Sequence, residues 1–134
     1  MLVRMTMAVL ATVGTVSAQE PDTEAGRNLY MSHCVQCHGI DAKGDGPMAE
    51  MLAIDTPDLS GLAVRNDGSF PTEVVARQID GRAQMLAHGG DMPIFGPFLD
   101  SDQHVALRLP SGLPMMTSLP LANVVIYLES IQEK

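Results

Sequence analysis

The sequence contains, at positions 34–38, the stretch Cys34-Val35-Gln36-Cys37-His38, which holds both cysteines of a chain of 134 residues. Two cysteines three positions apart enclose too short a loop to stabilise a fold as a disulfide. Structural zinc sites normally use four ligands, usually with a second cysteine or histidine pair at short spacing. The shortage of cysteines therefore leaves few chemical roles for this pair.

One role that fits is covalent attachment of haem, because the stretch has the form Cys-x-x-Cys-His. The two sulfurs add to vinyl groups on neighbouring pyrroles, so they must lie about one helical turn apart on one side of the chain. His38 then falls under the iron and can supply the proximal nitrogen. The alternative is a redox-active Cys34–Cys37 disulfide in a small helical protein. Such a site is expected near a βαβ pattern, and none is visible. The sequence predicts one covalent haem c with its iron, bound by Cys34, Cys37 and His38.

The first eighteen residues have the form of a secretory signal peptide. Arg4 precedes an apolar stretch, and Val16-Ser17-Ala18 matches the small-x-small cleavage pattern. The apolar stretch is shorter than the roughly 20 residues needed to span a bilayer. We expect cleavage after Ala18, a mature chain of one domain over residues 19–134, a periplasmic location and no stable membrane insertion afterwards.

The chain is acidic, with a formal net charge of −8. Cleavage would remove the positive charge of Arg4 and make the mature chain more acidic still. Nucleic acids and anionic membrane surfaces select for clusters of Lys and Arg, so neither is an expected partner. The balance instead suits a protein partner with a basic docking patch.

The pattern of apolar residues predicts an all-α domain. One helix begins at Asp22 or Thr23 and runs to about His33, a second covers 71–80, and a third forms the C-terminal segment after residue 118. Residues 82–119 are rich in Gly and Pro and show no sustained period. So long a segment either wraps a ligand or contains an unrecognised element, such as a helical turn near Asp102–Leu107.

The order of these features resembles that of the class I monohaem cytochromes c. The resemblance implies a small cytochrome c-like helical domain wrapped around one haem. It also implies that the first and last helices cross with a glycine at the contact. The matching positions are Gly26 and Tyr30 in the first helix, Cys34–His38, Gly46-Pro47, Met92-Pro93, and Tyr127-Leu128 in the last helix.

The resemblance also implies roles for residues beyond the motif. A loop proline of the family sets its carbonyl against the proximal histidine, which fixes the ring and raises its basicity, and Pro47 matches that position. Leu59 and Phe70 match positions that pack around the porphyrin. Burial in an ordinary core predicts the same two residues.

The sixth iron ligand implied by the resemblance is Met92. It precedes a proline and an aromatic residue, as the distal methionine of the family does. Because Met92 lies unusually far from the last helix, either the chain has an insertion between Gly96 and Ser118, or the ligand is Met115 or Met116. A histidine ligand or an open position also stays possible.

These features favour an electron-transfer protein over an enzyme with its own catalytic residues. Iron with two axial protein ligands is closed to substrates and suits single-electron exchange. Expected partners are redox proteins, namely a dehydrogenase, the cytochrome bc complex, or a terminal oxidase or reductase. The alternatives are a dedicated cytochrome c subunit of a periplasmic oxidoreductase for sulfur or alcohol oxidation, and a haem-based ligand sensor with an open sixth position.

Overall fold

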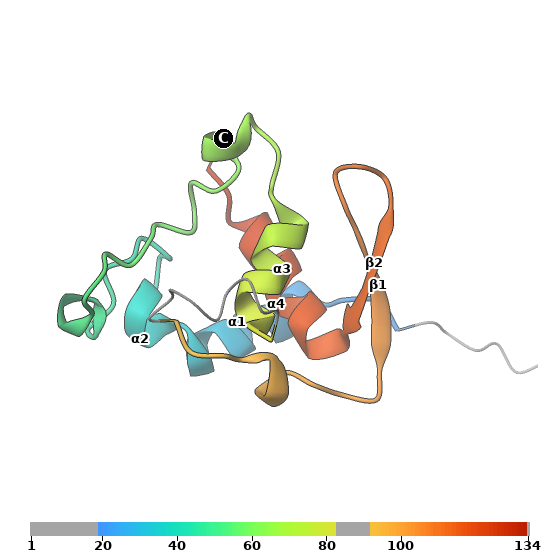
Figure 1. Ribbon diagram of the computed structural model, residues 1–134, viewed down its shortest axis with the longest axis horizontal. Helices are drawn as coiled ribbons and strands as arrows, with labels where there is room; N and C mark the ends of the chain where they lie inside the picture. The colour runs from blue at the N-terminus through green and yellow to red at the C-terminus, as the bar shows by residue number, and fades with distance from the viewer. Residues whose placement is uncertain (1–18, 83–91, 134) are drawn as a thin grey trace, which may run out of the picture.

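The computed structural model describes residues 19–82 and 92–133, so the predicted signal peptide and its cleavage site lie outside the described residues. Within these ranges the chain forms four α-helices and one small sheet (Figure 1). No helix within the described ranges is long and apolar enough to cross a bilayer. The elements are α1 (Thr23–His33), α2 (Val35–His38), α3 (Thr72–Asp80), β1 (His104–Arg108), β2 (Pro114–Ser118) and α4 (Leu119–Ser130), with 3₁₀ turns η1 (Ala49–Met51), η2 (Val64–Asn66) and η4 (Gly96–Phe98).

The crossing of α1 and α4 forms the centre of the fold. Asp22 caps α1 by accepting a hydrogen bond from the Glu24 N–H, and its own N–H bonds the Asn123 side chain on α4. At the crossing, a Cβ atom on Gly26 would lie 1.9 Å from the backbone oxygen of Asn123, so only glycine fits. One turn further on, the rings of Tyr30 and Tyr127 pack 5.3 Å apart. The predicted glycine contact between the first and last helices is confirmed.

Helix α3 lies against α4 and closes one side of the core. Its buried side chains include Val75, Ala76 and Ile79, which follow the helical period. Gly81 ends the helix in the left-handed conformation, with φ of 67°, which glycine adopts without strain. This helix ends where the sequence pattern indicated and begins one residue later, with Pro71 at its N-cap.

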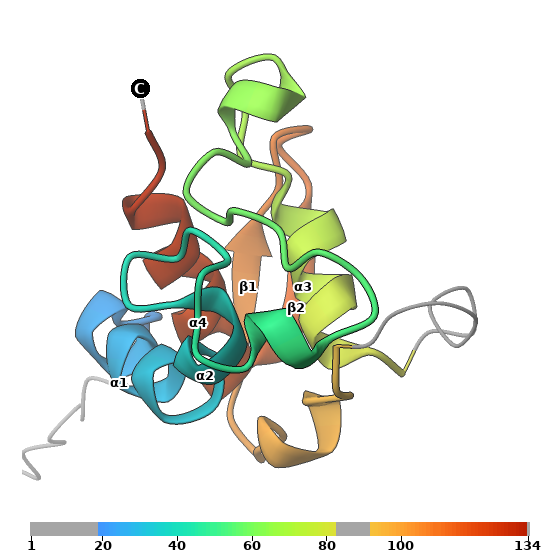
Figure 2. The ribbon, with the colours of Figure 1, turned by 90° about the vertical axis from the view of Figure 1, so that its left-hand side faces the viewer.

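Residues 82–119, which showed no sustained period of apolar residues, contain a two-stranded antiparallel hairpin. Strand β1 occupies the region where a helical turn was a possibility, and Val105 and Leu107 point into the core while their neighbours are exposed. Figures 1 and 2 show α3 and α4 between α2 and this hairpin. The predicted helical class is confirmed, and the hairpin is an addition on the side opposite α2.

Candidate functional site

The two cysteines and the histidine of the motif lie on one face of a nearly continuous helical course. The Cys34 N–H donates to the Tyr30 carbonyl, and the N–H groups of Cys37 and His38 both donate to the Cys34 carbonyl. Positions 34, 37 and 38 therefore have the i, i+3, i+4 relation that brings side chains together on a helix. Both thiols are free and half-buried.

The electrostatics of Cys34 disfavour the dithiol alternative. Burial, followed by repulsion from a Cys37 thiolate, raises the pKa of the Cys34 thiol to about 11. Thiol–disulfide catalysts need the opposite shift, because the thiolate is the attacking species. Within residues 19–82 and 92–133, moreover, no group of three or more His, Cys, Asp or Glu side chains could hold a simple metal ion. The pair is better suited to addition onto a prosthetic group than to redox cycling.

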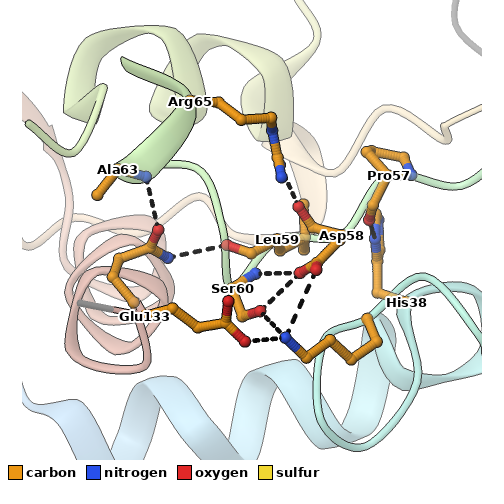
Figure 3. A network of polar contacts seen from close by, with 10 residues as sticks. His38, Pro57, Asp58, Leu59, Ser60, Ala63, Arg65 and Glu133 are labelled. Carbon is orange, nitrogen blue, oxygen red and sulfur yellow. Dashed lines mark hydrogen bonds and ion pairs between the residues drawn. The ribbon is translucent and has the colours of Figure 1, made fainter. Parts of the chain in front are cut away.

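The His38 side chain is 8% exposed, and its Nδ1 atom lies 3.4 Å from the carbonyl oxygen of Pro57 (Figure 3). A carbonyl can only accept a hydrogen bond, so this contact favours the tautomer with the proton on Nδ1. Burial lowers the pKa of His38, and the Pro57 carbonyl partly offsets that shift. The lowered pKa favours the neutral ring, in which the Nε2 lone pair can bind a metal.

The carbonyl next to His38 belongs to Pro57, so the prediction of Pro47 for this position is wrong. The Gly46 N–H bonds the Cys37 carbonyl, and a Cβ on Gly46 would lie 2.5 Å from the Gln36 oxygen. This close approach keeps Pro47 beside the backbone of α2. The chain returns to the His38 ring ten residues later. The sequence held a signal for Pro57, since it lies two residues before Leu59, which the resemblance places near the porphyrin.

Tyr30 connects the helix crossing to the site. Its hydroxyl donates to the carbonyl of Gly39, the residue directly after His38, at 2.7 Å, and the side chain is fully buried. Burial, followed by the charges of nearby acidic groups, raises the pKa of Tyr30, so the phenol stays protonated and able to donate. The backbone leaving α2 is thus held by a side chain of α1.

The two residues expected to line the porphyrin lie in different surroundings. Leu59, two residues after Pro57, is half-buried against the core, and its N–H donates to the Ala42 carbonyl. Phe70 is a core residue that also borders an open cavity of about 390 Å³ together with residues of β1 and α4. Leu59 therefore follows Pro57, which contacts His38, by two residues, whereas the burial of Phe70 is equally explained by the ordinary core.

Met92 belongs to a segment held close to the motif. It packs half-buried against the core, and three residues later the Phe95 N–H donates to the Ile79 carbonyl. The Phe95 ring lies 6.2 Å from the ring of His33, the residue before Cys34. The residues directly before Met92, including Gly89-Gly90-Asp91, and His88 lie outside the described part of the chain.

Met115 and Met116 lie in β2, on the hairpin. The strand register pairs them with Leu107 and Ala106, and Met116 is 63% exposed. Helices α3 and α4 lie between this strand and α2 (Figure 1). The structure does not bring either methionine together with His38.

The side chains present fit covalent haem, since two free thiols and a neutral imidazole share one helical face. The family model described as "Cytochrome c" matches residues 23–108. Over 53 residues the chain is 40% identical to the "Cbb3-type cytochrome c oxidase subunit FixPc" of Rhizobium leguminosarum bv. viciae. The matched residues make up 40% of this chain and 17% of that protein. No solved structure matches the chain significantly. Because the family model covers well over half of the sequence, the chain belongs to the cytochrome c family and is an electron-transfer protein with covalently bound haem c.

Proposed function

We propose that this cytochrome is a periplasmic single-electron carrier, with haem c tethered at Cys34 and Cys37 and held by His38 and Met92 as axial ligands. The observation that carries the proposal is the contact between His38 Nδ1 and the Pro57 carbonyl, which leaves Nε2 free for iron. When bound, the haem supplies a one-electron couple whose potential depends on its axial ligands and their surroundings.

Each side chain has a distinct part in this proposal. Cys34 and Cys37 keep the prosthetic group on the protein after export. Pro57 orients His38 and raises the basicity of Nε2 by accepting a hydrogen bond from the Nδ1–H group. Met92 contributes a neutral thioether, which raises the reduction potential relative to a second histidine.

The proposed location and partners rest on sequence and charge. Residues 1–18 have the form of an export signal, with cleavage after Ala18. The net charge of −8 favours transient docking to redox proteins with a basic patch, because complementary charge speeds encounter more than it strengthens binding. The name of the relative in Rhizobium favours a terminal oxidase as the electron acceptor.

The first test compares visible spectra of the haem-loaded wild type with those of Met92→Ala and Met116→Ala. We expect the oxidised wild type to show the weak long-wavelength band of methionine–iron ligation, and Met92→Ala to lose it. Met116→Ala is the matched control, since this exposed strand methionine should leave the band in place. Survival of the band in Met92→Ala, with its loss in Met115→Ala or Met116→Ala, would refute Met92 as the ligand.

A second candidate function is that of a permanent subunit of an oxidase complex, because the relative carries that description. A subunit should co-purify with its catalytic partner at fixed stoichiometry and resist dissociation by salt. A diffusible carrier should exchange electrons at rates that fall as ionic strength rises. Binding of carbon monoxide by the reduced protein would instead favour the ligand sensor with an open sixth position.

A further inference from the structure

The Pro57 carbonyl belongs to a segment that has no helix or strand of its own. Residues 52–63 run between the turns η1 and η2, and Pro57 lies near the middle of this stretch. No ladder of backbone hydrogen bonds therefore fixes its distance from His38. Contacts with other parts of the chain must hold the segment in place.

Two of these contacts come from Gln132, two residues past the end of α4. Its Nε2 atom donates to the Leu59 carbonyl at 2.8 Å and to the Leu128 carbonyl at 2.7 Å. Its Oε1 atom accepts from the Ala63 N–H at 2.8 Å. One amide thus joins the last helix to two points of the segment, Leu59 and Ala63, and Figure 3 marks both bonds as dashed lines.

A second set of contacts to the same segment is ionic. Lys43 bonds the Ser60 hydroxyl at 2.6 Å, lies 3.5 Å from a carboxylate oxygen of Asp58, and pairs with Glu133. The Lys43 side chain is 39% exposed and that of Glu133 is 57% exposed. Exposed ion pairs of this kind contribute little, whereas Gln132 is half-buried and makes all three of its bonds to backbone atoms.

We propose that Gln132 is a positioning residue for the iron ligand: it holds the segment that places the Pro57 carbonyl 3.4 Å from Nδ1 of His38. The inference rests on the proposed role of His38 as the proximal ligand. It links the C-terminal end of the chain to the electronic properties of a site on α2.

The proposal has a defined chemical consequence. If the amide is lost, the segment moves more freely and the hydrogen bond from the Nδ1–H group to the Pro57 carbonyl weakens. The imidazole then becomes less basic and stabilises oxidised iron less, so the reduction potential rises. The same loosening lets the Nδ1 proton exchange with water faster.

The experiment uses the haem-loaded chain as wild type, Gln132→Ala, Gln132→Glu and Gln103→Ala. Glutamate keeps an acceptor for the Ala63 N–H but cannot donate to Leu59 when ionised, so it should behave like alanine if that bond matters. Gln103→Ala is the control, because this exposed glutamine lies just before β1. Solvent exchange of the His38 Nδ1 proton in the reduced protein is followed by NMR, and the potential by spectroelectrochemistry.

We expect both Gln132 variants to exchange this proton at least about tenfold faster than wild type, with a raised potential, and Gln103→Ala to match wild type. Lower unfolding stability in the Gln132 variants with unchanged exchange and unchanged potential would overturn the proposal, since Gln132 would then be merely structural. An equal effect from Lys43→Ala would also overturn it. Absence of an axial-imidazole Nδ1 proton from the wild-type spectrum would refute His38 as ligand as well, so the two failures are distinguishable.

Discussion

The crossing of α1 and α4 and the segment around Pro57 both serve the same site, but they are held in different ways. At the crossing, helices approach so closely that Gly26 has no space for a methyl group. At the segment, Pro57 is fixed from a distance by hydrogen bonds from Gln132 and Lys43. The first region is a close-packed helix contact with no space for a larger side chain, and the second is a loop held by a few polar bonds.

The two regions affect different properties: the crossing mainly sets the stability of the fold, and the segment mainly sets the basicity of His38. Packing at the crossing sets the position of α1 and hence of the motif that follows it, and overpacking such a contact is costly. The polar bonds of the segment contribute less free energy, but they decide how a carbonyl meets His38. Substitutions at the crossing should therefore lower the free energy of unfolding, whereas substitutions at the segment should alter the hydrogen bond to His38 and hence the reduction potential.

The largest effect is expected from Gly26→Ala. The added methyl would meet the Asn123 backbone oxygen at 1.9 Å and the Tyr127 Cβ at 2.9 Å, so the two helices must move apart. We expect the free energy of unfolding to fall by about 3 kcal/mol or more, despite the better helix propensity of alanine. Guanidinium denaturation of the haem-loaded protein measures the change.

A matched control for that variant is Ser32→Ala, on the exposed face of the same helix. This change should alter the free energy of unfolding by no more than about 0.5 kcal/mol. If Gly26→Ala proved as stable as Ser32→Ala, the crossing would be looser than its geometry indicates, and the contrast between the two regions would fail.

Features that depend on local pattern or close packing could be predicted from the sequence. The Cys34–His38 stretch, the glycine contact at Gly26 and the helix over 71–80 each leave a mark in a few adjacent residues. The hairpin was missed because each strand has only five residues, and β2 lacks the alternation seen in β1. A period of two over five residues is too short to stand out from a loop rich in Gly and Pro.

Features that depend on polar contacts between distant residues could not be predicted. Pro47 and Pro57 both follow the motif, and only the path of the glycine loop decides which carbonyl reaches His38. Gln132 lies 73 positions from Leu59 in sequence, and a lone glutamine near a chain end carries no pattern. Such contacts arise from the folded arrangement and not from any local signal.

An intermediate effect is expected from Tyr30→Phe, which tests the link between the two regions. The change leaves the buried Gly39 carbonyl without the hydroxyl that bonds it at 2.7 Å. We expect the free energy of unfolding to fall by about 1–2 kcal/mol, with little change in potential because Pro57 still orients His38. Tyr127→Phe is the control, since the described residues show no hydrogen bond from its hydroxyl. A large shift in potential without loss of stability would contradict this division of roles.

The smallest effect concerns Asp58 and the pH dependence of the segment. Hydrogen bonds from the Ser60 hydroxyl and N–H, together with the charge of Lys43, lower the pKa of Asp58 below its ordinary value of 3.8. The resulting stabilisation is fully present above pH 3.8 and is lost as the pH falls through the lower, folded-state pKa. Because the side chain is about one-third exposed, we expect less than about 1 kcal/mol.

Asp58→Asn should therefore remove a small part of the acid-induced loss of stability, measured as the free energy of unfolding from about pH 5 downwards. Ser60→Ala should remove a smaller part, since the Ser60 N–H still donates to the carboxylate. An Asp58→Asn variant with the pH dependence of wild type would show that the turn at Asp58 adds nothing to the stability of the segment. The segment would then be held by its other contacts, those of Gln132 among them, and the amide variants described above should have the same effect on His38 above and below the pKa of Asp58.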